Sequence, residues 1–281
     1  MPRGAAVREA YRHCLHLTRK YHTGFPVPLR ALPGHLRGPM AAIHCFARRA
    51  NDAANEDTLS TAQRLAELDR LEADLRIADP DDPMMLALRD ARQRHALPRQ
   101  PFIDLLDGSR QDARQTRYAD FGELMAYCRR SANPIGRLLL QMVGYTDDIH
   151  LGYADAICSG LQLIRLYQSL DLDYQRRGRI YLPQDEMARF GVSESHIRDR
   201  ISDVPMRRLM QLQYRRADRL LRSGAPLGKA LPGRLGLGIR MTVMGGARVL
   251  YQLGRQQDPF SRPQLRIGDR LAILRAALLP R

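Results

Sequence analysis

Apolar residues recur at helical spacing along almost the whole chain. In residues 6–22, Val7, Tyr11, Cys14 and Leu15 fall on one side of a helix, as in an amphipathic helix that packs against a core. Strict alternation of apolar and polar positions and hairpin turns, the signs of strands, are absent. The pattern therefore predicts an all-α protein.

Segments rich in proline or glycine separate the predicted helices. GFPVPLRALPG at 24–34 and DPDDP at 79–83 are such breaks, and GRIYLP at 178–183 is expected to be extended. No linker, repeat or composition shift divides the chain, so we expect one domain over residues 1–281. The predicted helices cover residues 6–22, 36–55, 58–78, 83–96, 99–112, 118–130, 131–144, 150–174, 184–190, 193–200, 203–223, 228–254 and 267–278.

The chain is strongly basic, with a net charge of +15 that is almost entirely arginine, since lysine occurs only at Lys20 and Lys229. Such an excess favours anionic partners, namely nucleic acid, an anionic membrane surface or phosphorylated ligands. A coding bias toward arginine on a solvated surface explains it equally well. The arginines are scattered, no nucleic-acid reader motif is present and only 6% of residues are aromatic, so no nucleic-acid partner is expected.

Localisation and redox state follow from what the sequence lacks. The first 22 residues have no apolar core of a signal peptide, and no apolar run approaches 18 residues. The four cysteines have no metal-ligand spacing, which indicates buried free thiols in a reducing compartment. The glycine-rich stretch 236–246 follows no strand, so it is not an NADPH-type dinucleotide loop; its glycines are expected to permit close helix packing. We expect a cytoplasmic protein with peripheral contact at the inner face of the membrane.

Two stretches carry candidate chemistry. In FARRANDAANED (46–57), Asn51 and Asn55 are four residues apart, a spacing at which carboxylates on a helix could share a magnesium ion. Carboxamides bind that ion much more weakly. In 161–183, Asp171 and Asp173 are followed by arginines that could hold phosphate oxygens. A solvated helix end with internal salt bridges is the alternative interpretation of this second stretch.

The sequence resembles the squalene/phytoene synthase family over nearly its whole length, and most of all the hydroxysqualene synthases of bacterial hopanoid synthesis. The most specific blocks are YCRRSANPIGRLLL (127–140) and GRIYLPQDEMARFGV (178–192). Further blocks in the family's order are GFPVPLRALP (24–33), AAIHCFARRANDAANE (41–56), FIDLLDGSRQD (102–112) and IRMTVMGGARVLYQL (239–253).

The resemblance implies an isoprenoid-synthase-type helical fold around a central apolar cavity. It also implies two aspartate-rich motifs that bind Mg²⁺ and grip prenyl diphosphates, with the metal neutralising the departing diphosphate and the dry cavity protecting the carbocation. The expected ligands and partners are therefore Mg²⁺, a prenyl diphosphate or isoprenoid lipid, and a catalytic relative from the same family.

Matched onto this chain, the motifs are eroded. The first aspartate motif falls on Asn51 and Asn55, and the second falls on Arg165, Ser169 and Asp173, of which only Asp173 is kept. Asp52 is one helical step from Asn51 and could lean toward the site, whereas Asp171 should point away from the face of Ser169 and Asp173. We expect catalytic roles for Asp173 and Arg48 and, as a substitute acid, for Asp52. We expect diphosphate binding by Arg48, Gln162, Arg165, Arg179 and Tyr181.

Two functions remain open. A non-catalytic or weakly active member would bind a prenyl lipid or assist a catalytic relative, because four of the five motif positions have lost their metal-binding side chains. A divergent but active prenyl diphosphate transferase would rely on the retained Arg48, Gln162 and Asp173, with the arginine at 165 taking over part of the metal's electrostatic role.

Overall fold

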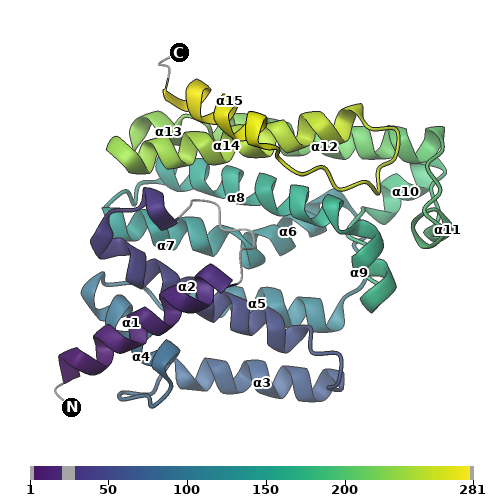
Figure 1. Ribbon diagram of the computed structural model, residues 1–281. Helices are drawn as coiled ribbons and strands as arrows, with labels where there is room; N and C mark the ends of the chain where they lie inside the picture. Colours follow the sequence, from purple (N-terminus) through teal and green to yellow (C-terminus); the bar gives the residue numbers. More distant parts are fainter. Residues whose placement is uncertain (1–2, 21–28, 279–281) are drawn as a thin grey trace. The chain divides into compact units, whose positions relative to one another are not determined.

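The computed structural model describes residues 3–20 and 29–278, and it confirms the all-α prediction (Figure 1). In these residues the only β-type pairing is an isolated parallel bridge between Tyr118 and Pro183. Residues 21–28, which hold the end of the first predicted helix and the start of the proline-rich break, lie outside the described residues. The rest of that break contains a short 3-10 turn, Leu29–Ala31.

The chain divides into two compact units. The first comprises the chain up to Arg114 together with Arg130–Leu151, and the second comprises Gln115–Arg129 and Gly152–Arg281. The predictions of a single domain and of a central cavity depend on how the two units are arranged relative to each other. Both therefore stay predictions.

The first unit is built around helix α2. Its buried face includes Met40, Ile43 and Phe46, and Phe46 meets Phe102 of α5 edge-on with ring centroids 5.7 Å apart. Helices α1, α4 and α5 pack against α2, so this face supplies most of the burial that stabilises the unit. The helices of the first unit are α1 (Arg3–Lys20), α2 (Gly34–Ala54), α3 (Thr61–Asp74), α4 (Pro83–Arg94), α5 (Gln100–Arg114) and α7 (Asn133–Val143).

The second unit contains the longest helices. Helix α14 packs against α12, α13 and α15, and α10 packs against α12. Helices α6 and α8 belong mostly to this unit. Its helices are α6 (Phe121–Ser131), α8 (Asp148–Gln168), α9 (Leu170–Arg177), α10 (Gln184–Phe190), α11 (Glu194–Arg198), α12 (Val204–Gly224), α13 (Leu227–Ala230), α14 (Gly233–Arg255) and α15 (Ile267–Leu278).

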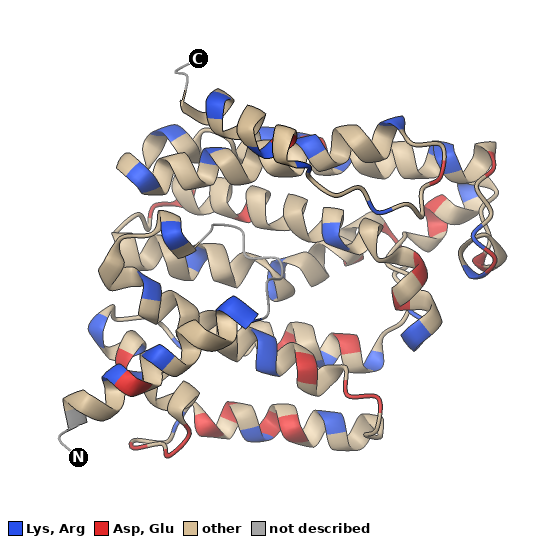
Figure 2. Cartoon of the chain, viewed as in Figure 1, with Lys and Arg blue, Asp and Glu red and all other residues tan. Residues whose placement is uncertain are grey.

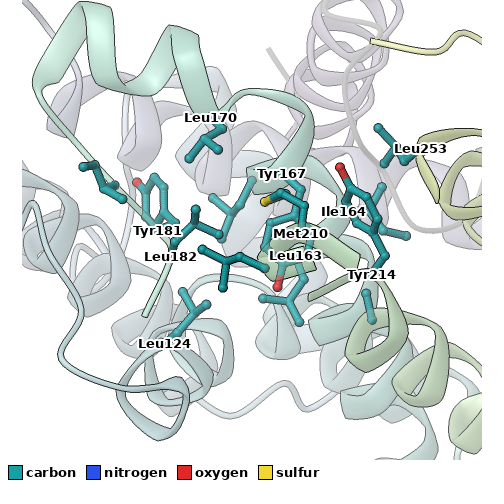
Figure 3. Close-up of a cluster of buried hydrophobic side chains, with 14 of the residues drawn as sticks. Leu124, Leu163, Ile164, Tyr167, Leu170, Tyr181, Leu182, Met210, Tyr214 and Leu253 are labelled. Atoms are coloured by element: carbon teal, nitrogen blue, oxygen red, sulfur yellow. The ribbon is translucent and has the colours of Figure 1, made fainter. Parts of the chain in front are cut away.

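The core of the second unit gathers apolar side chains of α8 and α12, among them Leu163 and Met210, around tyrosine rings (Figure 3). Tyr181 stacks on Tyr118 with ring centroids 5.5 Å apart and also lies 5.5 Å from Tyr127. Tyr167 and Tyr214 meet edge-on at 6.0 Å. Such ring pairs add to the burial of their apolar area, so they anchor the segment that carries Tyr181.

The predicted extended segment 178–183 is confirmed. The Ile180 N–H donates to the Thr116 carbonyl at 2.9 Å, and the Gln184 N–H donates to the Tyr118 carbonyl at 2.9 Å. These bonds satisfy backbone groups that a helix would otherwise pair internally. The segment is thereby held against residues 116–118 of the same unit.

Two of the predicted helices are each divided in the structure. The helix predicted over 228–254 forms α13 (Leu227–Ala230) and α14 (Gly233–Arg255), and the helix predicted over 150–174 is also divided. Helix α8 ends at Gln168 and α9 begins at Leu170, with Ser169 between them. The Ser169 N–H still donates to the Arg165 carbonyl at 3.2 Å, and the Asp173 N–H donates to the Ser169 carbonyl at 2.8 Å, so the break is confined to this one residue. Hydrophobic periodicity continues through the break and could not reveal it.

Two minor predictions are confirmed. All four cysteines, Cys14, Cys45, Cys128 and Cys158, are free and buried. Gly246 of α14 lies where an added Cβ would approach Leu221 Cδ1 to 2.8 Å and Leu161 Cδ2 to 3.1 Å. The glycine-rich stretch 236–246 therefore permits close helix packing, as expected.

We predict that Gly236→Ala lowers the free energy of unfolding by about 1–3 kcal/mol. A Cβ at Gly236 would stand 2.1 Å from the Leu231 carbonyl oxygen, and a backbone atom cannot move aside as a flexible side chain would. Gly245→Ala, on the same helix, meets its nearest neighbour at 3.9 Å and should stabilise by up to about 1 kcal/mol. Thermal and denaturant unfolding of the two variants measure this difference, and equal stabilities would contradict the packing described.

Candidate functional site

The first motif lies at the end of α2, where the chain leaves the helix. Asn55 is the C-cap residue, and its backbone N–H donates to the Asp52 carbonyl at 3.0 Å. Its side-chain amide donates to the Asn51 carbonyl at 2.7 Å. An aspartate could not donate that bond, and its charge would oppose the negative end of the helix dipole. Asn55 therefore stabilises the end of α2 in a way that a metal-binding carboxylate would not.

Asp52, the neighbour that could have replaced Asn51, is engaged within its own helix. Its carboxylate accepts from Arg48 Nε at 2.8 Å, one turn earlier. Both side chains are partly exposed, so the pair contributes little stability. It does place a positive charge beside the carboxylate at this end of α2, which opposes the approach of a cation.

The second motif lies at the junction of α8 and α9. The Ser169 hydroxyl is 2.5 Å from Asp173 Oδ2, and the Asp173 N–H donates to the Ser169 carbonyl at 2.8 Å. One turn earlier, Arg165 Nε donates to Gln162 Oε1 at 3.2 Å. The retained carboxylate thus has a hydroxyl partner at the position where the resemblance places a second carboxylate.

Asp171 faces away from this pair, as the helical geometry predicted. It is only 2% exposed and forms ion pairs with Arg262 Nη2 at 2.5 Å and with Arg200 Nη1 at 3.3 Å. Arg200 adopts a left-handed backbone conformation with φ of 54°, which costs about 1 kcal/mol or more. These contacts make Asp171 part of the framework and remove it from the candidate metal ligands.

The donor set at the motif positions does not fit a magnesium–diphosphate site. Mg²⁺ prefers carboxylate oxygens and phosphate oxygens in octahedral geometry. Two carboxamides, a guanidinium and a hydroxyl occupy four of the five positions. Among the described residues, no three His, Cys, Asp or Glu side chains lie together as a metal-binding group. We therefore derive no catalytic step through a metal ion.

The remaining predicted diphosphate-binding residues, Arg179 and Tyr181, lie in the second unit. Arg179 is 5% exposed and Tyr181 is 3% exposed, and Tyr181 belongs to the aromatic core described above (Figure 3). Their contacts with a substrate stay predictions, as do those of Arg48, Gln162 and Arg165.

Comparison with known proteins identifies the family. The model of the squalene/phytoene synthase family matches residues 18–270. The chain belongs to the squalene/phytoene synthase family. The crystal structure of squalene synthase HpnC from Alicyclobacillus acidocaldarius superposes with a TM-score of 0.82 at 33% identity, over 89% of this chain and 95% of that one. The predicted isoprenoid-synthase-type fold is thereby confirmed.

Curated relatives come from two branches of the family. The hydroxysqualene synthase of Rhodopseudomonas palustris is 31% identical over 238 residues, which are 84% of this chain and 81% of the relative. The phytoene synthase of Mycobacterium tuberculosis is 35% identical over 187 residues, 66% of this chain. The chain spans 61% of the length of that phytoene synthase.

Sequence reasoning missed the partners that hold these side chains. Arg262 lies 91 positions from Asp171, so no local spacing indicates the pair. The cap formed by Asn55 could have been found, because asparagine near the end of a predicted helix is a known C-terminal signal. The Ser169–Asp173 bond could also have been found from its spacing of one helical turn.

We predict that Asp171→Asn destabilises the protein by about 2–3 kcal/mol. This is less than for a fully buried ion pair, because both guanidiniums are partly exposed. The melting temperature should fall equally with Mg²⁺ and with EDTA, since Asp171 serves as an ion-pair partner. A rise in wild-type melting temperature on adding Mg²⁺ that Asp171→Asn abolishes would show instead that Asp171 binds the metal.

Proposed function

We propose that this chain acts in isoprenoid biosynthesis as a non-catalytic or weakly active member of its family. In this role it binds a prenyl diphosphate or isoprenoid lipid, or assists a catalytic relative. The observation that carries the proposal is the pairing at the two motifs. Asn55 caps its helix, Asp52 pairs with Arg48, and Asp173 bonds to Ser169. Each side chain is satisfied by the protein itself.

Electrostatics supports the same conclusion. Several carboxylates held close together repel one another, and a bound cation normally compensates that repulsion. Here the repulsion has been removed by substitution, and Arg165 adds a positive charge where the family has a neutral ligand. A guanidinium can hold diphosphate oxygens directly through charge-assisted hydrogen bonds. The motifs therefore favour anion binding over metal-dependent bond cleavage.

A divergent, active transferase is the competing function. The retention of Arg48, Gln162 and Asp173, together with the buried GRIYLP segment, favours it. It requires the remaining carboxylates to leave their present partners when substrate and metal arrive. The turnover experiment below separates the two functions directly.

We further propose that the protein works in the cytoplasm with peripheral contact at an anionic membrane. The net charge of +15 supports this location, and the prenyl chains expected as ligands partition into lipid. No helix in the described part of the chain is long and apolar enough to cross a bilayer. The scattered arginines and the low aromatic content make nucleic acid the less favoured anionic partner.

We predict no metal-dependent turnover. Purified protein incubated with farnesyl diphosphate or presqualene diphosphate should release pyrophosphate at the same rate with Mg²⁺ and with EDTA. The combined variant Asn51→Asp, Asn55→Asp, Arg165→Asn and Ser169→Asp should gain Mg²⁺-dependent release, because it restores the donor set. A wild-type chain that forms lipid product with Mg²⁺ would overturn the non-catalytic function.

We also predict that prenyl diphosphate binding does not need a metal. Calorimetric titration with farnesyl diphosphate should give similar affinities in Mg²⁺ and in EDTA. Arg165→Asn should weaken binding about tenfold, or about 1.4 kcal/mol. Arg219→Asn removes an exposed arginine from α12 and serves as the matched control. Equal weakening by the two variants would show that only net charge matters, and no binding in any condition would leave the partner-subunit role alone.

A further inference from the structure

Helix α15 is apolar on two faces, and only one of them is covered. Ile273 and Ala277 are 8% and 1% exposed. Four further apolar residues, which we name the α15 stripe, are exposed. They are Ile267 at 78%, Leu271 at 62%, Leu274 at 38% and Leu278 at 60%. At 100° per residue these four positions fall within about 60° of one another. A helix that only packs on its own protein has no need of a second apolar stripe.

The side of α15 that faces α14 is fixed by specific bonds. Arg248 Nε donates to Asp269 Oδ1 at 2.7 Å, and Gln252 Nε2 donates to Asp269 Oδ2 at 3.1 Å. At the other end of the helix, Arg240 Nε donates to the Ala277 carbonyl at 2.9 Å. The Arg266 backbone N–H and the Arg248 guanidinium hold the pKa of Asp269 below its usual range. The helix is therefore anchored at both ends, with its stripe directed away from α14.

Positive charge surrounds the stripe. Arg270 and Arg275 lie about 40° beyond its two edges on the helical wheel. Among the described residues, no carboxylate forms an ion pair with Arg266, Arg270 or Arg275. Residues 248–278 contain six arginines and two aspartates, which gives a net charge of +4. Figure 2 shows basic residues along α12, α14 and α15 of this unit.

A pocket adjoins the beginning of the stripe. It has a volume of about 880 Å³ and is lined by residues of α14, the following loop and the start of α15, among them Arg248, Arg255 and Arg266. Tyr251, which is 51% exposed, also lines it, and the guanidiniums of Arg248 and Arg255 lie over its ring at 5.2 and 5.5 Å. A half-exposed tyrosine among arginines is typical of residues at a membrane–water interface.

We propose that α15 is a membrane-docking helix that inserts its stripe into the interfacial region of an anionic bilayer. The arginines that flank the stripe and line the pocket then contact lipid headgroups. Interfacial helices combine an apolar face with flanking basic residues in this way. The inference deepens the proposed peripheral membrane contact and is independent of whether the motif residues catalyse a reaction.

The same charges disfavour a second copy of the chain as the occupant of the stripe. A symmetric pair of α15 helices would bring the flanking arginines of one copy toward those of the other, and like charges at an interface oppose association. An anionic bilayer offers acyl chains that bury the apolar stripe and negatively charged headgroups that pair with the flanking arginines. The match to the family model covers residues 18–270, which include Ile267 of the stripe but not Leu271, Leu274 or Leu278.

Vesicle sedimentation tests the proposal with the full chain. The vesicles are phosphatidylcholine alone, or equal amounts of phosphatidylcholine and phosphatidylglycerol. The wild type should sediment with the anionic vesicles only, and high salt should weaken its binding. Leu271→Glu/Leu274→Glu should lower the partition coefficient at least about tenfold. Arg270→Gln/Arg275→Gln should lower it roughly thirtyfold, since each arginine near such a surface contributes about fivefold.

The matched control is Ala272→Glu/Ala276→Glu, which adds the same two charges to exposed positions of α15 outside the stripe. It should partition at least about tenfold better than the stripe variant, with circular dichroism showing all variants folded. Failure of the wild type to bind anionic vesicles, or equal binding by the two glutamate variants, would overturn the proposal. The proposal would also be overturned if the wild type did not bind vesicles but formed a concentration-dependent dimer, and if the variant Leu271→Glu/Leu274→Glu did not form that dimer. Prenyl diphosphate affinity is measured separately, without vesicles. A failure of the proposed ligand binding is therefore distinguishable from a failure of the proposed membrane docking.

Discussion

One buried carboxylate organises the end of the second unit. Asp171 can be buried at 2% exposure only because Arg262 and Arg200 neutralise it. Arg262 also donates to the Gln168 carbonyl, which the break between α8 and α9 leaves available, at 3.0 Å. The loop that carries Arg262 leads directly into α15. This ion pair therefore ties the loop that precedes α15 to the start of α9, while the bonds to α14 hold α15 itself.

The two motif segments share one physical feature. Asn55 and Ser169 both stand where a helix ends, and both carry a neutral donor: the Asn55 amide donates to the Asn51 carbonyl, and the Ser169 hydroxyl donates to Asp173 Oδ2. A carboxylate at either place could not donate that bond and, at the end of α2, would face the negative end of the helix dipole. Metal ligands impose such costs on a fold, and a chain released from binding metal can regain stability by replacing them.

The excess of arginine has more than one role. Arg262 and Arg200 neutralise a buried carboxylate, and Arg48 pairs with Asp52 on its own helix. Around α15 the arginines have few acidic partners, so their charge is directed outward. A uniform coding bias does not explain why arginines lie on both edges of an exposed apolar stripe. At this surface, the arrangement favours an anionic partner over the coding-bias interpretation.

The sequence by itself determined the helical class, the family and nearly every helix, because apolar periodicity and proline or glycine breaks are local signals. It also gave the side chains at the positions where the resemblance places the two aspartate motifs. It did not reveal the break at Ser169, because apolar periodicity continues from α8 into α9. Only the tertiary structure decided that Asp171 is a framework residue, since its arginine partner is 91 positions away. Only the tertiary structure showed which face of α15 is covered, because periodicity identifies an apolar stripe but not whether another helix packs against it.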